Sequence, residues 1–209
     1  MLKDITAQDL KIVSLFTRDY AASYSINQIT TKLKLNYSYT FNKIKVLVKK
    51  NLLKLKKEGQ SNRITLNLKN LDTIRLLVFI EQEEVKTLNN SSLDLISKEA
   101  LLIDPLCCIG LFGSRVSGKA SKDSDWDVFM ISQKEKKREL NKILSRLPYL
   151  DNVHILVFSI EEFQEGLASP EETVVKHLLR NKLLIYNPFP FYNSIYNFER
   201  IKYAPSQTD

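Results

Sequence analysis

The sequence predicts an α+β protein in two parts, a basic N-terminal domain and a C-terminal domain with a mixed sheet flanked by helices. Residues 1–70 hold 14 Lys and Arg against 4 Asp and Glu, whereas the remaining residues hold 17 against 20. The first third shows helical spacing followed by one alternating hairpin pattern, and strand-like apolar runs alternate with helical patterns later. We therefore expect a first domain at 1–70, a helical linker at 71–92, a second domain at 93–187 and a C-terminal arm at 188–209.

Three helices and a hairpin are expected in the first domain. Thr6, Ser25 and Ser38 each stand before a run with helical spacing, where a side-chain oxygen can cap the first turn. Residues 53–57 and 63–68 alternate like two strands on either side of a turn at 58–59. This order of elements resembles the winged helix domain of bacterial and archaeal regulators.

The resemblance implies nucleic-acid binding through the third helix and the hairpin. The net charge of +10 over residues 1–70 favours a polyanionic partner, DNA or RNA, for this segment. The alternative is a protein-docking module whose lysines are simply solvated. The third helix of a winged helix suits the major groove and the hairpin suits phosphates. The candidate contacts are Tyr39, Asn42, Lys43 and Lys50 on the helix and Lys54, Lys56, Lys57 and Arg63 in the hairpin.

The segment between the domains reads as two helices. Leu71, Ile74 and Leu77 recur at helical spacing, and the Asn- and Ser-rich residues 89–92 break that pattern and offer a new cap. Residues 93–103 resume it, so we expect this second helix to open the C-terminal domain. At the other end, residues 188–209 are aromatic with little periodicity, and we expect an extended arm there.

The most informative stretch is a glycine cluster between two apolar runs. Of the 5 glycines in the chain, Gly110, Gly113 and Gly118 fall within nine positions. A strand-like run, residues 106–112, precedes the turn, and another, residues 128–131, follows it. Glycine is enriched where the backbone turns sharply or approaches a ligand closely. The cluster therefore predicts a tight turn between two strands at which a ligand can bind.

Two carboxylates stand at the entrance to the second strand. Asp125 and Asp127 are two residues apart, so their side chains share a face and can bind one hard cation or a pair of Mg²⁺ ions that also hold phosphates. The order of strand, Gly113-Ser114, loop and Asp125-x-Asp127 resembles the DNA polymerase beta nucleotidyltransferase superfamily, especially its minimal branch. The resemblance covers about residues 100–187. It implies a nucleotide-phosphate turn at Gly113, Ser114 and Arg115, a metal pair at Asp125 and Asp127, Mg²⁺ or Mn²⁺ as cofactor and an NTP as substrate.

One position departs from that family. The family places a third carboxylate on a later strand, and the matching residue here, in the run 153–158, is His154. Imidazole is a poor ligand for Mg²⁺ but a competent general base near neutral pH. His154 therefore replaces the base, marks weakened or lost catalysis, or fills an open edge of the site. Asp151 is a substitute carboxylate, although it falls on the opposite strand face if the strand already runs there.

The remaining elements follow from caps and apolar runs. Ser159 begins one helix pattern. Ser169 begins a second, with Pro170 in its first turn and Glu172 as the capping-box partner. Residues 182–186 read as the short strand that often ends this fold.

Two function classes stay open from the sequence. One is an enzyme that moves a nucleoside monophosphate from an NTP to a hydroxyl of a protein, small-molecule or nucleic-acid acceptor, with release of pyrophosphate. Minimal nucleotidyltransferases that act as antitoxins, which modify a partner protein, belong to this class. The other is a DNA-binding transcriptional regulator whose degenerate nucleotidyltransferase domain only binds nucleotide. The first residues lack a signal-peptide core and no apolar run reaches about 18 residues, so we expect a cytoplasmic protein without a membrane partner.

Overall fold

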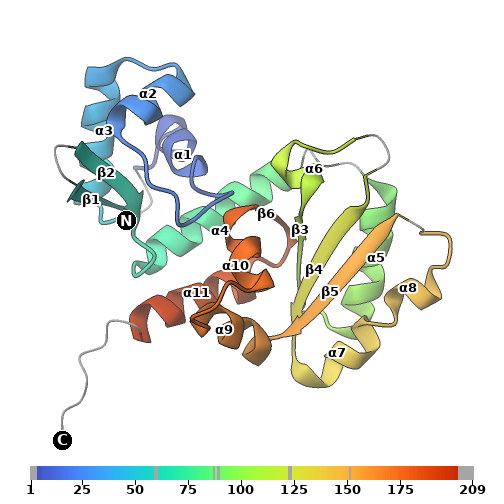
Figure 1. The fold of residues 1–209 in the computed structure, drawn as a ribbon. Helices are drawn as coiled ribbons and strands as arrows, with labels where there is room; N and C mark the ends of the chain where they lie inside the picture. The colour runs from blue at the N-terminus through green and yellow to red at the C-terminus, as the bar shows by residue number, and fades with distance from the viewer. Residues whose placement is uncertain are drawn as a thin grey trace, which may run out of the picture.

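The computed structural model describes residues 4–58, 61–86, 88, 90–121, 124–150 and 152–201. Figure 1 shows an N-terminal unit of helices and a hairpin, one long helix that leaves it, and a C-terminal unit in which helices lie on both sides of a sheet. None of the helices formed by these residues could span a lipid bilayer.

The N-terminal unit consists of three helices and a two-stranded hairpin. The strands pair antiparallel, and the register sets Leu53 against Leu66 and Lys56 against Arg63. An isolated bridge between Tyr24 and Ile64 ties the hairpin to the segment before the second helix. The elements are α1 (Ala7–Ser14), α2 (Ile26–Leu33), α3 (Tyr37–Lys49), β1 (Leu53–Glu58) and β2 (Ser61–Leu66).

The first two helix caps are those predicted from the sequence, and the third is not. Thr6 and Ser25 each accept a hydrogen bond from a backbone N–H three residues later, and the side chains at those positions bond back. The cap of α3 is Asn36, whose side-chain oxygen accepts from the N–H groups of Ser38 and Tyr39 at 2.9 and 3.4 Å. The prediction of Ser38 as the cap was therefore wrong by two residues, because Asn36 already satisfies the free N–H groups of that first turn.

The helix α4 (Leu71–Val85) joins the two units. Its residues Leu77 and Ile80 are buried in a hydrophobic cluster that also contains Phe16 of the N-terminal unit and Phe129 and Phe191 of the C-terminal unit. The apolar core is therefore continuous across the predicted linker, and α4 contributes to both units.

The C-terminal unit is built on a four-stranded mixed sheet in the order β5-β4-β3-β6. The two central strands pair antiparallel, β4 and β5 run parallel, and β6 is antiparallel to β3. The strands are β3 (Cys108–Phe112), β4 (Trp126–Ser132), β5 (Val153–Ser159) and β6 (Lys182–Tyr186). The helices are α5 (Ser91–Ile103), α6 (Ser114–Ser117), α7 (Lys134–Leu140), α8 (Ile143–Arg146), α9 (Ile160–Ala168), α10 (Val174–Arg180) and α11 (Phe189–Ile201).

Alternate residues of the central strands are buried in two different hydrophobic cores, one on each face of the sheet. Ile109 and Val128 join the cluster beneath α5, α7 and α8, whereas Cys108 and Phe129 join the cluster beneath α9, α10 and α11. Gly110 lies opposite Phe129 in the register, and a Cβ atom there would stand 2.4 Å from the Phe129 ring. The glycine is needed because the ring lies directly against its backbone.

Two expectations for the C-terminal third were wrong. The cap of α10 is Thr173, whose hydroxyl accepts from the N–H of Lys176, and Ser169 is instead the C-terminal cap of α9. The expected arm at 188–209 contains α11, in which Phe191, Tyr192 and Ile195 are buried against the sheet. Their spacing of one and three residues places them on one helical face, and residues 202–209 lie outside the described residues.

Candidate active site and nucleic-acid interface

The turn after β3 brings the backbone against a carboxylate. Gly113 has φ +77°, and a Cβ atom built on it would lie 2.1 Å from the Oδ2 atom of Asp127. A side chain at this position is therefore excluded twice, by the backbone conformation and by the carboxylate. Ser114, the first residue of α6, follows directly, so the predicted phosphate turn and the predicted metal residue lie side by side.

The sheet register gathers the three predicted catalytic residues. Asp127 on β4 pairs with Phe112 on β3 and with His154 on β5. The Nδ1 atom of His154 lies 3.8 Å from Oδ1 of Asp127, and its Nε2 atom lies 3.9 Å from Oδ2 of Asp125. These distances are too long for hydrogen bonds, and the imidazole is 67% exposed. The ring therefore stands at the open side of the site, between the two carboxylates and solvent.

The residues fit a divalent cation in part. Asp125 and Asp127 offer carboxylate oxygens, the donors that hard cations prefer, and each lies beside the same His154 ring. The third neighbour is an imidazole, and no group of three or more His, Cys, Asp and Glu within the described ranges is arranged as a metal site. Asp151, the alternative carboxylate, lies outside the described residues. The donor set is therefore two carboxylates, with His154 beside them.

Arg115 supports the loop that carries the carboxylates. Its guanidinium donates to the carbonyl oxygens of Ser124 and Asp125 and lies 4.4 Å from the centre of the Trp126 ring. These contacts fix the approach to β4 from the side of α6. The expectation that Arg115 holds the triphosphate stays a prediction, and such a contact would require the guanidinium to share or leave these partners.

Sequence reasoning missed Asn181. Its side-chain amide donates to the carbonyl oxygen of Gly113 at 3.3 Å, so the end of α10 supports the turn. The pairing partner is 68 residues away along the chain, and no local pattern signals such a contact.

Sequence reasoning also missed a buried polar cluster directly after Asn181. The ammonium of Lys182 donates to Glu81, to the carbonyl oxygen of Thr17 at 2.8 Å and to the hydroxyl of Tyr192 at 3.0 Å. The side chains of Lys182 and Glu81 are 0% and 1% exposed. Burial lowers the pKa of Lys182, and the Glu81 carboxylate opposes that shift. The cluster joins the N-terminal unit, α4, β6 and α11.

A comparison with known families decides the class of the C-terminal unit. A family profile described as "Nucleotidyltransferase domain" matches residues 93–203, more than half of the chain. The chain belongs to this nucleotidyltransferase domain family. No curated protein matches the chain. The nucleotidyltransferase domain contains Gly113, both carboxylates and His154, and it extends through α11 rather than ending near residue 187. Its general activity is transfer of a nucleoside monophosphate from an NTP.

The N-terminal unit, which precedes the nucleotidyltransferase domain, carries the candidate nucleic-acid-binding residues. Of the candidates on α3, only some are exposed to solvent. Tyr39 and Asn42 are exposed. Lys43 lies 3.3 Å from the buried Asp9 carboxylate and also donates to Thr6, whereas Lys50 donates to the carbonyl oxygen of Asp4. The roles predicted for these two lysines thus compete with contacts inside the unit.

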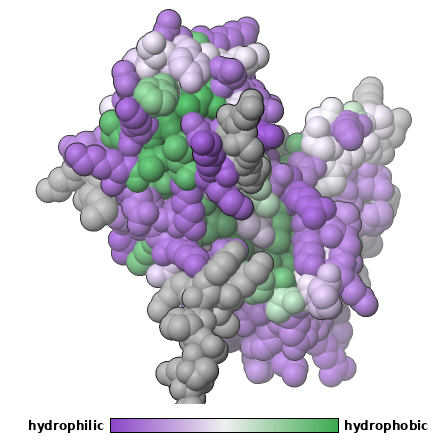
Figure 2. Space-filling model, turned by 60° about the vertical axis from the view of Figure 1, so that its left-hand side comes forward, coloured by the Kyte–Doolittle hydropathy of each residue, from purple (hydrophilic) through white to green (hydrophobic). Residues whose placement is uncertain are grey.

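The hairpin presents its cations more openly. Lys54, Lys56 and Lys57 are exposed, and Arg63 donates to the side chain of Gln28 at 3.2 Å. Lys54 and Lys56 lie on one face of β1 and Lys57 on the other. Lys56 stands directly opposite Arg63, an arrangement of like charges that destabilises a strand pair. Val46 and Leu55 are large apolar residues that are also exposed, and Figure 2 shows a hydrophobic patch on the N-terminal unit.

Proposed function

We propose that this nucleotidyltransferase transfers a nucleoside monophosphate from an NTP to a hydroxyl acceptor, and that the N-terminal unit is a winged helix that binds DNA or RNA. The observation that carries the catalytic part is the contact between the Gly113 turn and Asp127, with Asp125 and His154 beside it. A phosphate held at the turn would lie next to two oxygen donors that can bind its counter-ion.

Each residue has a role in this proposal. Gly113 leaves room for the phosphates, and the hydroxyl of Ser114 donates to a phosphate oxygen. Asp125 and Asp127 hold Mg²⁺ or Mn²⁺, which when bound neutralises charge on the triphosphate. The acceptor oxygen forms a bond to the α-phosphorus while the bond to the bridging oxygen breaks and pyrophosphate leaves. His154 accepts the proton of the acceptor hydroxyl, because its exposed ring faces both the carboxylates and solvent.

The test is label transfer by the full chain. Each NTP, labelled at its α-phosphate, is incubated with Mg²⁺ or Mn²⁺, with and without cell extract, and products are followed by electrophoresis and chromatography. We expect a labelled product that Asp127→Asn abolishes. The control Asp94→Asn removes an exposed carboxylate on α5 and should transfer like wild type. Transfer by Asp127→Asn at the wild-type rate would contradict the site.

A second candidate rests on His154 in place of the family's third carboxylate. In that case the domain binds nucleotide without transferring it, and the chain is a nucleic-acid-binding regulator. Calorimetry separates the two candidates. A regulator would bind Mg-NTP in wild type and lose binding in Asp127→Asn, but it would give no labelled product with any NTP, metal or extract.

The nucleic-acid part rests on the hairpin. Lys56 opposite Arg63 costs stability in the free protein, and a phosphate backbone would relieve that repulsion. Lys54→Gln with Lys56→Gln should weaken duplex binding by the full chain for all sequences alike. The slope of log K against log salt should become shallower by about 2, roughly one unit per lysine. The control pair Lys134→Gln and Lys136→Gln, exposed on α7, should leave the slope unchanged.

If the wild-type chain binds neither DNA nor RNA at low salt, the winged helix is a protein-docking module. The exposed Val46 and Leu55 would then belong to its contact surface.

A further inference from the structure

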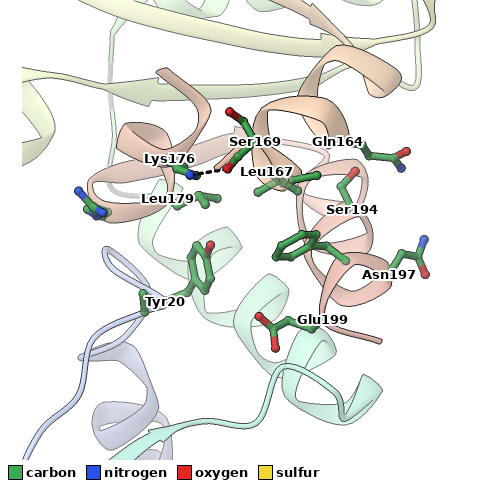
Figure 3. A pocket seen from close by; sticks show the side chains of 13 residues that line it. Tyr20, Gln164, Leu167, Ser169, Lys176, Leu179, Ser194, Asn197 and Glu199 are labelled. Carbon is green, nitrogen blue, oxygen red and sulfur yellow. Dashed lines mark hydrogen bonds between the residues drawn. The ribbon is translucent and has the colours of Figure 1, made fainter. Parts of the chain in front are cut away.

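A large cavity lies away from the candidate active site, at the junction of the two units. It has a volume of about 1140 Å³, opens to solvent, and is lined by the segment after α1 together with α9, α10 and α11 (Figure 3). Small-molecule sites commonly measure about 300–1,000 Å³, so the space is sufficient for an organic ligand. None of Gly113, Ser114, Asp125, Asp127 and His154 lines it.

The walls of the cavity are largely apolar. Leu167 and Leu179 are each 5% exposed and close it on the side of α9 and α10. Tyr20 enters from the N-terminal unit, and Phe198 lines the cavity from α11. Burial is the main reason that the pKa of Tyr20 is raised well above its usual value, so its hydroxyl stays neutral at physiological pH. The cavity can therefore hold the apolar body of a ligand beside two aromatic rings.

The cationic side chains of the cavity already have partners. The ammonium of Lys176 donates to the carbonyl oxygens of Ser169 and Glu171 at 2.6 and 2.5 Å. The first of these bonds is drawn in Figure 3. The guanidinium of Arg180 donates to Glu172 at 2.8 Å. These two cations are therefore committed to the protein rather than offered to an anionic ligand.

The unpaired polar side chains are of a different kind. Within the part of the chain that the structure describes, no hydrogen bond or ion pair is formed by the side chains of Tyr20, Gln164, Asn197 and Glu199. Of these groups only Glu199 carries a charge, and it is negative. The charges of Glu199 and Asp19 raise the pKa of the Tyr20 hydroxyl further, whereas the charge of Arg180 lowers it, so charges of both signs act on that hydroxyl.

We propose that this cavity binds an organic amine. Its ammonium group lies at Glu199, whose carboxylate has no hydrogen-bond or ion-pair partner among the described residues, and the Tyr20 ring can add a cation–π interaction. Its apolar body lies against Leu167, Leu179 and Phe198. Because Tyr20 belongs to the N-terminal unit and the other residues to the nucleotidyltransferase domain, the ligand contacts both units at once. The proposal does not depend on the proposed transfer activity.

The experiment compares three probes that share one ring system. Tryptamine is cationic, indole-3-acetamide is neutral and indole-3-acetate is anionic at neutral pH. Their affinities for the full chain are measured by calorimetry. We expect tryptamine to bind at least tenfold more tightly than indole-3-acetate. Equal or weaker binding of tryptamine, or binding of none of the three, overturns the proposal.

Variants then locate the binding. Glu199→Gln should remove most of the preference for tryptamine, whereas Glu165→Gln, an exposed carboxylate on α9 outside the cavity, should not. Ala21→Trp should fill the cavity from its exposed rim and weaken all three probes. Circular dichroism establishes that each variant is folded. Tryptamine binding that is unchanged in both Glu199→Gln and Ala21→Trp places the amine elsewhere and overturns the proposal.

Discussion

Replacement of Lys182 by Met tests the cluster that joins the two units. The side chains of Lys182 and Glu81 are fully buried, so Lys182→Met leaves an uncompensated carboxylate in the core. Removal of one partner from a buried pair typically costs about 3–5 kcal/mol. At roughly 2–4 °C per kcal/mol for a chain of this size, the melting temperature should fall by about 6–20 °C.

The double variant Lys182→Met with Glu81→Leu sharpens the test. It removes both charges and leaves unpaired neutral groups, among them the N–H of Leu184, which bonds to Glu81 at 3.1 Å. We expect its loss of stability, measured by urea denaturation, to be well below the sum of the two single losses. The control Lys86→Met breaks an exposed pair with Glu83 on the same helix and should leave the midpoint unchanged. A loss below about 1 kcal/mol for Lys182→Met, or strict additivity in the cycle, would refute the reasoning.

Three further outcomes are expected. Gly113→Ala should prevent Mg-NTP binding in calorimetry, because the new Cβ atom would meet the Asp127 carboxylate, while the circular dichroism spectrum stays native. Wild-type affinity in this variant would show that the Gly113 turn does not belong to the nucleotide site. His154→Asp should raise the ratio of Mg²⁺- to Mn²⁺-supported label transfer, since it adds a hard oxygen donor, and an unchanged ratio would place residue 154 outside the metal site. Burial raises the pKa of the Cys107 thiol from 9.0 to about 12, so the folded state favours the neutral thiol. The stability that this preference contributes is fully present below pH 9. Between pH 9 and pH 12 the free energy of unfolding therefore falls by about 1.4 kcal/mol per pH unit. Urea titrations at pH 8 and pH 10 should show a larger loss of stability for wild type than for Cys107→Ala, and equal losses would exclude the thiol as the cause.

The features that the sequence predicted correctly depend on short-range chemistry. A capping box needs residues three apart, and Thr6 and Ser25 provide it with Asp9 and Gln28. The pair Asp125 and Asp127 was also identified from a short spacing; its carboxylates lie 3.9 and 3.8 Å from the His154 ring, and its role as a metal pair stays a prediction. The predicted cap Ser38 lies two residues beyond the actual cap Asn36, because Ser and Asn are both favoured cap residues and residue type alone does not fix where the first turn begins.

The features that sequence reasoning missed depend on contacts between distant segments. Asn181 supports Gly113 across 68 residues, and Lys182 meets Glu81 across 101. A lysine and a glutamate so far apart in the sequence are expected to be solvated surface charges, and only the fold shows that they are buried together. The helix α11 was missed for a related reason, because its aromatic residues have a clear periodicity only when Phe191, Tyr192 and Ile195 are taken as one face.

The position of α4 determines which part of this chain can be studied in isolation. β6 is the last strand of its sheet, and the Glu81 carboxylate of α4 accepts a hydrogen bond from its Leu184 N–H. A fragment cut at residue 93, where the family match begins, would lack this cover and would present an unpaired strand edge beside an uncovered Lys182. Such edges pair readily with other chains, so we expect that fragment to aggregate. A fragment that begins at Asn70, which caps α4, would keep the edge covered.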